Sequence, residues 1–446
     1  MRFGGDNFDQ ILKNMKTKLI IFLAAMFGLI TITKAQQDTV RLGLLRDIPH
    51  WMAEYHVPCV GVGLIENGRV KWVNNFGNLQ DGHPAPNNTL FNIASQTKPV
   101  VAMLVVKLVQ DRKWDMDEPL SHYWIDPDIA GNPFTSKLTT RLVLSHQTGF
   151  PNWRSDNGEN KLHFNFEPGT KFGYSGEGFE YLRKTLEAKF HKPLNFLLDS
   201  VLLKPLGLED TQYWSENLDK PRFAMWHNGQ GNLYPTSIQT SVNAADDLIS
   251  SIEDYCKLGI YAMNNASLYA KPEVKVKGNY FRGLGWGLVQ NLPDGEYAFE
   301  HGGSDIGVRT MAIFLPKSKN GIVVMTNGDN GMFIIDRIIK CALVAGNQIL
   351  GIMNKTENTH KRIMLPENII QSYAGIYEQN NGKIMKVEHE GNGIKVSGDG
   401  LPTAILSPES TTKFFLEGYD VQLEFTDASS LIVYENGKQV MKMNRK

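Results

Sequence analysis

A serine and a lysine three residues apart, Ser95 and Lys98, are the residues of this chain whose spacing is best suited to chemistry. On a helix, positions three apart lie on one face, one above the other. In that geometry a lysine amine can take the proton from a serine hydroxyl, which makes a nucleophile without a histidine. The pair therefore predicts acyl transfer through a serine ester.

The same spacing occurs a second time, at Ser410 and Lys413. A Ser-x-x-Lys match is expected by chance about once per 240 residues, so a chain of this length is expected to contain about two and the pattern alone decides nothing. Ser410 falls among short alternating strands. Lys98 is followed over 100–109 by an apolar segment typical of a helix buried in a large core. A serine at the start of such a helix would also direct backbone N–H groups toward negative charge on an acyl oxygen. Context favours Ser95.

Two further segments carry groups that could assist a serine nucleophile. Tyr174, within residues 166–176, offers a phenolic oxygen that could relay a proton beside a lysine. Taken alone, an aromatic side chain packed in a turn explains Tyr174 better. Residues 300–305 hold paired glycines, which permit a close backbone approach, and the Ser304 N–H could be a second oxyanion donor beside that of Ser95. A glycine-rich strand entry with a surface histidine explains that segment equally well.

Taken in order, these segments resemble the penicillin-recognising serine hydrolases, the β-lactamase-related family of class C β-lactamases, D,D-carboxypeptidases and related esterases. Ser-x-x-Lys stands at Ser95–Lys98, Tyr-Ser-x begins at Tyr174, and His-x-Gly at His301–Gly303 replaces the Lys-Thr-Gly common elsewhere. Residues 142–149 and 168–170 also look like the family, and the resemblance covers roughly residues 40–350.

The resemblance implies a role for each matching position. Ser95 would be the nucleophile that forms an acyl-enzyme, and Lys98 and Tyr174 would share the work of general base and proton relay. His301 would occupy the cationic position of the third motif. The backbone at Ser95 and Ser304, beside Gly303, would form the oxyanion hole. No metal or organic cofactor is implied.

Two departures from the family pattern bear on the substrate. Position 176 is glycine, where the penicillin-handling branch usually has an asparagine that grips the substrate's amide, so one contact favouring β-lactams and peptides is lost. A histidine at 301 is charged only part of the time near neutral pH, so we expect binding of a carboxylate to weaken as the pH rises. Arg309 could compensate, although a strand-edge charge is its simpler role.

The element pattern predicts an α+β fold with an antiparallel sheet. We expect a helix around 39–56, a hairpin at 61–73 with an Asn-Gly turn, and strands at 284–290, 309–315 and 322–326. Much of 95–263 has helical spacing, and an amphipathic helix follows at 333–343. Strands from both ends of the domain would then enclose a helical insertion flanked by terminal helices, which is the β-lactamase/transpeptidase-like arrangement.

Four regions are expected along the chain: a signal peptide at 1–35, a hydrolase domain at 36–350, a linker at 351–365 and a small β domain at 366–446. The last region shows short strands between 383 and 443 with Asn-Gly turns, which predicts a barrel or curled sheet. Its residues do not indicate whether this domain is a substrate lid, a wall-binding module or a stabilising cap.

The N-terminus predicts export. An apolar stretch over 19–33 follows Lys16 and Lys18, is too short for a comfortable membrane span, and allows cleavage after Ala35. Translation could begin at Met15. We therefore expect a periplasmic or secreted protein with no stable membrane span after cleavage; the alternative is an uncleaved anchor.

Composition is that of an ordinary globular chain of 446 residues, with 42% hydrophobic residues and a net charge of −1, which gives no reason to expect nucleic acid as a partner. The three cysteines, Cys59, Cys256 and Cys341, can form at most one bridge and show no metal-ligand spacing. Cys59 and Cys341 are expected to be buried apolar residues.

The sequence therefore predicts an exported serine hydrolase acting on a small-molecule ester, amide or peptide, as a carboxylesterase or a D-amino-acid peptidase. A class C-like β-lactamase and a non-catalytic cell-wall or ligand binder on the same scaffold remain alternatives. An α/β-hydrolase is excluded, because Gly173–Glu177 lacks the final glycine of Gly-x-Ser-x-Gly and His301–Gly303 lies on the wrong side of the serine. The oligomeric state stays open.

Overall fold

The structure is a computed structural model that describes residues 39–446, apart from 81, 159, 216–219, 236–240, 355–359, 380–381, 399–400, 417–420, 428 and 436. The expected signal peptide lies outside the described residues. A helix covers residues 39–55, as predicted, and its first part, up to His50, belongs to a separate unit of the chain. All other described elements belong to the unit Trp51–Lys446. Within the described ranges, no helix has the length and apolar character needed to cross a bilayer.

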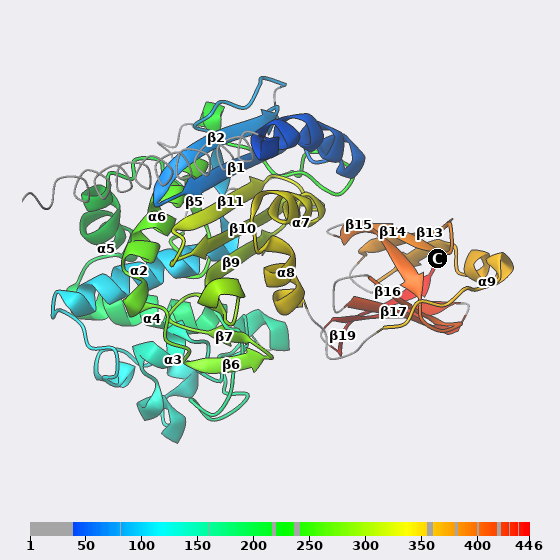
Figure 1. Cartoon of the computed structure of the whole chain (residues 1–446). Helices are drawn as coiled ribbons and strands as arrows, with labels where there is room; N and C mark the ends of the chain where they lie inside the picture. The colour runs from blue at the N-terminus through cyan, green and yellow to red at the C-terminus, as the bar shows by residue number, and fades with distance from the viewer. Residues whose placement is uncertain are drawn as a thin grey trace, which may run out of the picture. The chain divides into compact units, whose positions relative to one another are not determined.

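An antiparallel sheet of eight strands forms the framework around which the candidate site is built (Figure 1). Its strand order is β2-β1-β11-β10-β9-β8-β7-β6. The strands are β1 (Cys59–Glu66), β2 (Arg69–Gly77), β6 (Val274–Lys277), β7 (Tyr280–Arg282), β8 (Gly287–Val289), β9 (Ala298–Asp305), β10 (Val308–Leu315) and β11 (Asn320–Thr326). The β1–β2 hairpin turns at Asn67 and Gly68, which both have positive φ, as its Asn-Gly sequence predicted.

Helices α6 (Ile252–Asn264) and α7 (Gly331–Ala342) cover opposite faces of this sheet (Figure 1). A Cβ on Gly259 of α6 would lie 2.1 Å from Cε1 of Phe314, whereas a Cβ on Gly331 of α7 would lie 3.0 Å from Cβ of Arg309. Arg309 and Phe314 are five positions apart on β10 and therefore point to opposite faces. Both helices approach the sheet closely because glycine stands at the contact.

A mainly helical region lies between β2 and β6 in the sequence, which confirms the predicted α+β arrangement. Its helices are α2 (Thr97–Gln110), α3 (Thr140–Leu144), α4 (Gly176–Phe190), α5 (Leu194–Leu198) and α6. Helix α2 is buried on almost every side, as its apolar sequence indicated. The region also holds a three-stranded sheet, β3 (Leu90–Asn92), β5 (Leu248–Ser251) and β4 (Gln212–Tyr213), which the sequence did not reveal because strands this short show no alternation.

The C-terminal region is a closed antiparallel barrel, which confirms the barrel-like prediction. After α8 (Gly346–Asn354) and α9 (Glu367–Ser372) come its strands: β12 (Gly375–Glu378), β13 (Ile384–Glu390), β14 (Gly393–Gly398), β15 (Leu401–Pro408), β16 (Lys413–Phe415), β17 (Val421–Asp427), β18 (Ser430–Glu435) and β19 (Lys438–Arg445). Its core includes Tyr377, Phe414 and Phe425.

The second Ser-x-x-Lys copy forms part of this barrel and makes no Ser–Lys side-chain pair. Ser410 Oγ accepts a hydrogen bond of 3.0 Å from the backbone N–H of Lys413, in the turn before β16. The Lys413 ammonium instead pairs with Glu424 at 3.4 Å. The interpretation of this copy as a chance match agrees with that geometry.

One prediction about the cysteines was wrong. Cys59 and Cys256 are buried, but Cys341, near the end of α7, is exposed, and all three are free thiols. The apolar stripe of α7 runs through Ile334, Ile335, Ile338 and Ile339, which are buried. Position 341 falls beside this stripe rather than on it, so its side chain faces away from the sheet.

Candidate active site

Ser95 and Lys98 lie in direct contact at the start of α2. Ser95 belongs to a short 3-10 turn, Ala94–Gln96, that leads into the helix. Lys98 is 1% exposed, and its Nζ donates a hydrogen bond of 3.0 Å to Ser95 Oγ. The spacing predicted that the two side chains share one face, and the structure brings them within hydrogen-bond distance.

The turn that carries Ser95 has an unusual backbone. Ala94 has a φ of +47°, in the left-handed region that residues with a Cβ rarely adopt, at a cost of about 1–3 kcal/mol. Its N–H donates to Asn92 Oδ1 at 2.7 Å, which fixes the turn from the preceding strand β3. The Ser95 backbone is therefore held in one conformation by its surroundings.

A second contact fixes the Lys98 side chain from another part of the chain. Its Nζ donates to the carbonyl oxygen of Ala245 at 2.9 Å. The N–H of Leu248, in the same segment, donates to Thr97 Oγ1 at 3.2 Å. Residues 245–248 thus lie against the first turn of α2, a contact that no motif in the sequence marks.

Tyr174 completes the group around Lys98. Its ring centroid lies 4.9 Å from Lys98 Nζ. The ring stacks on His146, with centroids 4.3 Å apart, and His146 Nδ1 accepts a hydrogen bond of 3.2 Å from the N–H of Ser175. The structure therefore places Tyr174 beside Lys98, and the family-like segment 142–149 supplies the surface on which the tyrosine packs.

The third segment, 300–305, forms most of strand β9, and His301 in it is buried. The alternative of a glycine-rich strand entry with a surface histidine was therefore wrong. Gly303 lies against the turn that holds Ser95: a Cβ there would lie 2.3 Å from the carbonyl oxygen of Ile93 and 2.4 Å from Thr310 Oγ1. Glycine is required for this approach, as predicted. Ser304 follows it near the exposed end of the strand.

The structure corrects the expected charge of His301. Burial, together with the nearby cations Arg282 and Lys98, holds the pKa of His301 well below its usual value. Its Nδ1 lies 2.6 Å from the carbonyl oxygen of Gly302, which accepts the ring proton. His301 is therefore neutral near pH 7 and does not supply a cation there.

The cation beside this segment is Arg282 at the end of β7, which sequence reasoning missed. Its side chain is 13% exposed, and its Nη1 lies 3.6 Å from Glu300 Oε1. Its Cζ lies 5.9 Å from the ring centroid of Tyr174. Sheet pairing brings it here, because β8 joins β7 to β9, and only the register of those strands could have revealed it.

Arg309, the cation that could have compensated, is held by neighbouring groups. Its Nη1 donates to the carbonyl oxygens of Asp305 and Val308, at the turn between β9 and β10. Its Nη2 lies 3.7 Å from Asp329. These contacts agree with the simpler structural role.

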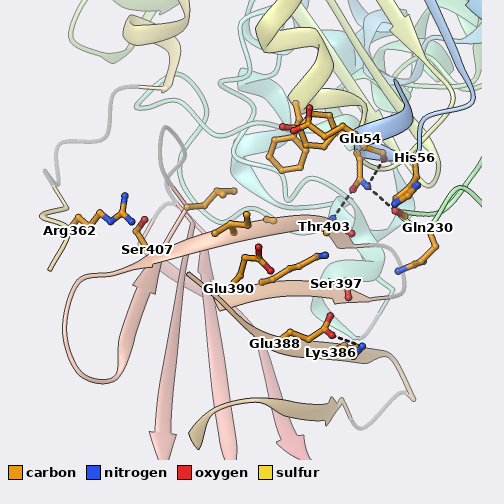
Figure 2. A pocket seen from close by; sticks show the side chains of 18 residues that line it. Glu54, His56, Gln230, Arg362, Lys386, Glu388, Glu390, Ser397, Thr403 and Ser407 are labelled. Carbon is orange, nitrogen blue, oxygen red and sulfur yellow. Dashed lines mark hydrogen bonds and ion pairs between the residues drawn. The ribbon is translucent and has the colours of Figure 1, made fainter. Parts of the chain in front are cut away.

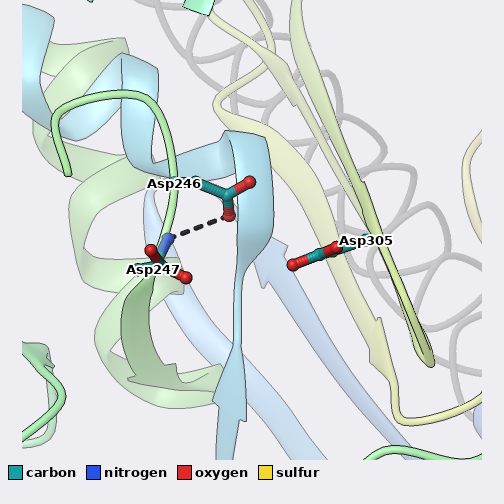
Figure 3. A group of neighbouring side chains, drawn as sticks. All are labelled: Asp246, Asp247 and Asp305. Atoms are coloured by element: carbon teal, nitrogen blue, oxygen red, sulfur yellow. Dashed lines mark hydrogen bonds between the residues drawn. The ribbon is translucent and has the colours of Figure 1, made fainter. Parts of the chain in front are cut away.

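Three carboxylates gather in one place, as Figure 3 shows. Asp246 and Asp247 follow Ala245, and Asp305 points toward them from β9, so that one oxygen of each lies within 4.8 Å of the others. Burial and then the Asp305 charge raise the pKa of Asp246 to about 7, and the same two causes raise that of Asp247 to about 6. The cluster adds negative charge beside Lys98.

A separate cavity of about 750 Å³ is lined by residues of 54–56, 229–230 and the barrel (Figure 2). Ser95, Lys98 and Tyr174 do not line it. Its charged residues include Lys386 and Glu388, which pair with each other at 2.7 Å. At its edge the N–H of Thr403 donates to Asn330 Oδ1 at 2.7 Å, which ties the barrel to the start of α7. The cavity is distinct from the Ser95 site.

The Beta-lactamase family model matches residues 44–339, which include the whole Ser95 site. The chain belongs to this family. Among curated relatives, Penicillin-binding protein 4* of Bacillus subtilis (strain 168) is 23% identical over 430 residues, which span 84% of this chain and 92% of that protein. Membership of the family explains why Ser-x-x-Lys, Tyr-Ser-x and His-x-Gly converge in one place.

Solved structures show the same fold at low sequence identity. The octameric penicillin-binding protein homologue from Pyrococcus abyssi superposes with a TM-score of 0.60 at 20% identity, covering 90% of this chain and 99% of that chain. The D-amino acid amidase from Ochrobactrum anthropi SV3 gives 0.54 at 21% identity, covering 66% of this chain and 91% of that chain. The family is one of serine hydrolases that act on small amide, ester or peptide substrates.

Proposed function

We propose that this chain is an exported serine hydrolase that cleaves a small ester or amide through an acyl-enzyme on Ser95. The observation that carries the proposal is the 3.0 Å contact between the buried Lys98 Nζ and Ser95 Oγ. A lysine this close can accept the hydroxyl proton as the oxygen attacks. Tyr174 lies next to the same amine and is proposed as the proton relay.

The proposed reaction has two steps. Ser95 Oγ bonds to the substrate carbonyl carbon while its proton passes to Lys98, and the developing oxyanion is stabilised by the N–H groups of Ser95 and Ser304. Tyr174 gives a proton to the leaving alcohol or amine and recovers one from Lys98. Water then adds to the acyl carbon, gives its proton to the same groups and breaks the Oγ–C bond, which releases the carboxylic acid and restores Ser95.

The substrate class follows from what surrounds this group. Glycine at 176 removes the amide that favours β-lactams, His301 is neutral, and the nearby cation Arg282 faces Glu300 at 3.6 Å, so an ester or an amide without a carboxylate anchor fits best. The D-amino acid amidase among the structural neighbours supports amides as well as esters. We therefore place a carboxylesterase or D-amino-acid amidase ahead of a β-lactamase.

Labelling with a fluorophosphonate probe tests the nucleophile. We expect the wild-type chain to be labelled, S95A to lose labelling, and K98M to slow it at least a hundredfold. S410A is the matched control, because it removes the serine of the second Ser-x-x-Lys copy, and should label at the wild-type rate. An unlabelled wild-type protein would support the non-catalytic binder instead.

A substrate panel tests the reaction class. We expect turnover of 4-nitrophenyl esters or D-amino acid amides that disappears in S95A. Nitrocefin hydrolysis as the dominant activity of the same preparation would make the chain a β-lactamase. D-alanyl peptides distinguish an amidase from an enzyme that requires a peptide leaving group.

Export rests on the apolar stretch over 19–33 behind Lys16 and Lys18. Expression of the full chain in a bacterial host with a periplasm, followed by fractionation and intact mass measurement, tests it. We expect a periplasmic product that begins at Gln36. An unprocessed chain in the membrane fraction would indicate the uncleaved anchor.

A further inference from the structure

His146, two residues after α3, holds the segment that carries Tyr174 from both sides of the tyrosine. The backbone N–H of Gly173 donates to the carbonyl oxygen of His146 at 2.8 Å. On the other side, the backbone N–H of Ser175 donates to His146 Nδ1 at 3.2 Å. One residue from a distant segment thus accepts hydrogen bonds from both chain neighbours of Tyr174.

The imidazole ring of His146 makes a third contact, with the tyrosine itself. It stacks on the Tyr174 ring, with centroids 4.3 Å apart and planes 30° apart. The same imidazole packs against Phe179, with centroids 5.4 Å apart, and edge to face against Phe172 at 6.2 Å. His146 is 1% exposed, so its ring cannot turn away without displacing these close-packed neighbours. The imidazole therefore fixes the place of the Tyr174 ring.

The backbone of His146 is held in an unfavourable conformation. Its φ is +57°, in the left-handed region that residues with a Cβ rarely adopt. Glycine would adopt this conformation without strain, but it would supply neither the Nδ1 acceptor nor the stacked ring. The strain at position 146 thus accompanies a side chain that acts on Tyr174.

The bond to Ser175 requires a neutral imidazole. A ring nitrogen accepts a hydrogen bond only when it carries no proton, so the proton of His146 lies on Nε2. Burial is the main cause that holds the pKa of His146 well below its usual value. The charges of Arg282 and Lys98, and then that of His301, lower it further. The ring therefore keeps its accepting nitrogen at neutral pH.

The place of the Tyr174 ring matters because Lys98 lies next to it. Lys98 Nζ is 4.9 Å from the ring centroid, and its own position is fixed by Ser95 Oγ and the carbonyl oxygen of Ala245. In the proposed reaction, the proton taken from Ser95 reaches the leaving oxygen or nitrogen through Lys98 and the Tyr174 hydroxyl, as the bond from that atom to the acyl carbon breaks. A displacement of about 1 Å can slow such a transfer by about a hundredfold.

We propose that His146 is a positioning residue that holds the Tyr174 hydroxyl where it can protonate the leaving group. The proposal rests on the proposed function, because it concerns the proton transfer that follows attack by Ser95. It predicts an effect that a purely structural role would not produce: the loss of His146 should matter most when the leaving group needs a proton. 4-Nitrophenolate leaves as a stable anion, whereas ethoxide must be protonated as it departs.

The experiment compares kcat/KM for 4-nitrophenyl acetate and ethyl acetate, measured as acid release in a pH-stat, because these esters share one acyl group. We expect H146L, which removes the acceptor and the ring, to lose at least about thirtyfold on ethyl acetate and less than about threefold on 4-nitrophenyl acetate. If the substrate panel identifies a different acyl group, its 4-nitrophenyl and ethyl esters take the place of the acetates.

H146N separates the acceptor from the ring. Its amide oxygen can replace Nδ1 as the acceptor, and asparagine tolerates a left-handed backbone. We therefore expect a smaller loss, of about three- to tenfold on ethyl acetate, and no loss on 4-nitrophenyl acetate. H191N is the matched control, because His191 at the end of α4 also has a left-handed backbone, with a φ of +53°, but is exposed. It should change neither value.

A double variant tests whether His146 acts through Tyr174. Y174F should show the same selective loss on ethyl acetate as H146L does. Y174F/H146L should lose less than about threefold beyond Y174F, because no hydroxyl remains to be placed. Equal losses on both esters in H146L, or losses that multiply in the double variant, would overturn the proposal.

The remaining outcomes distinguish this proposal from the proposed function. A Y174F variant without a selective loss would overturn the proton relay and this inference together, while fluorophosphonate labelling would still identify Ser95 as the nucleophile. A wild-type chain that is not labelled would overturn the proposed function itself. If H146L fails to fold by circular dichroism, H146N decides alone, and equal values or equal losses on the two esters would contradict the role of His146.

Discussion

The side-chain amide of Gln96 donates a hydrogen bond of 3.0 Å to the carbonyl oxygen of His301. Gln96 is fully buried, and its backbone carbonyl oxygen accepts a hydrogen bond of 3.0 Å from the hydroxyl of Tyr255 on α6. One residue inside Ser-x-x-Lys thus ties the turn of Ser95 to strand β9, and so fixes the separation of the two proposed oxyanion donors.

Replacing Gln96 should therefore affect both stability and reactivity. Q96A leaves the buried oxygen of His301 without this donor, which should lower the free energy of unfolding by about 1–3 kcal/mol. We expect the rate of fluorophosphonate labelling to fall at least tenfold, because β9 is no longer held at the Ser95 turn. Q371A, at an exposed position on α9, is the control and should change neither quantity. Unaltered labelling in a destabilised Q96A would show that the bond is structural only.

The paired glycines of β9, Gly302 and Gly303, should differ sharply in how well they tolerate substitution by alanine. A Cβ on Gly303 would lie 2.3 Å from a backbone oxygen, whereas the nearest atom to a Cβ on Gly302 would be the flexible end of Met311, at 3.1 Å, and the backbone oxygen of Thr310 would lie at an ordinary contact distance of 3.5 Å. We expect G303A to abolish labelling and to lower stability by about 2 kcal/mol or more. G302A should fold and label nearly as the wild type does. Equal effects of the two variants in urea denaturation and labelling would contradict the close approach at Gly303.

The charge of Arg282 should be visible in the titration of its neighbours. Burial lowers the pKa of both His146 and His301, and Arg282 lowers each further. Removing the cation in R282Q favours the protonated imidazole, so both pKa values should rise while burial still holds them below the ordinary value of about 6.5. NMR titration of the histidine ring signals measures this. R69Q, at an exposed site on β2, should leave both unchanged.

The Asp246 carboxyl should make the fold less stable as the pH rises. Its pKa is about 7 in the folded chain, against about 3.9 when unfolded, so the folded state holds the proton more tightly. The contribution of this carboxyl to the free energy of unfolding is fully present below about pH 4 and is lost as the pH rises through about 7. D246N should thus raise the free energy of unfolding by roughly 1–3 kcal/mol at pH 8 and by little at pH 4.5.

Urea denaturation at the two pH values tests this, with D294N, at an exposed position, as the control. A gain in D246N of the same size at both pH values would show that the carboxyl titrates normally in the folded chain.

The features that could be predicted from the sequence depend on nearby residues. Ser95, Lys98 and helix α2 follow from a local apolar run, and the β1–β2 hairpin follows from its Asn-Gly turn. Strand β9 could not be recognised, because its two glycines have low strand propensity and its pairing partners, β8 and β10, are set by the sheet.

The unpredicted features of the site depend on contacts between distant segments. The charge of His301 follows from burial and from Arg282 on another strand, which the residue type at 301 does not reveal. The glycine at 176 was visible as a departure, but its cause, the ring of Trp153, which would lie 2.7 Å from a Cβ there, is 23 positions earlier in the chain. Likewise, only folding places Asp305 beside Asp246.

The exposed cysteine of α7 makes the native chain selectively modifiable. Burial raises the pKa of the Cys59 and Cys256 thiols, so neither forms the reactive thiolate at neutral pH, whereas the Cys341 thiol faces solvent. A maleimide fluorophore or a nitroxide spin label should therefore attach at position 341 alone, without any engineered cysteine. A spectroscopic reporter on the helix that covers the sheet is thus available in the wild-type protein.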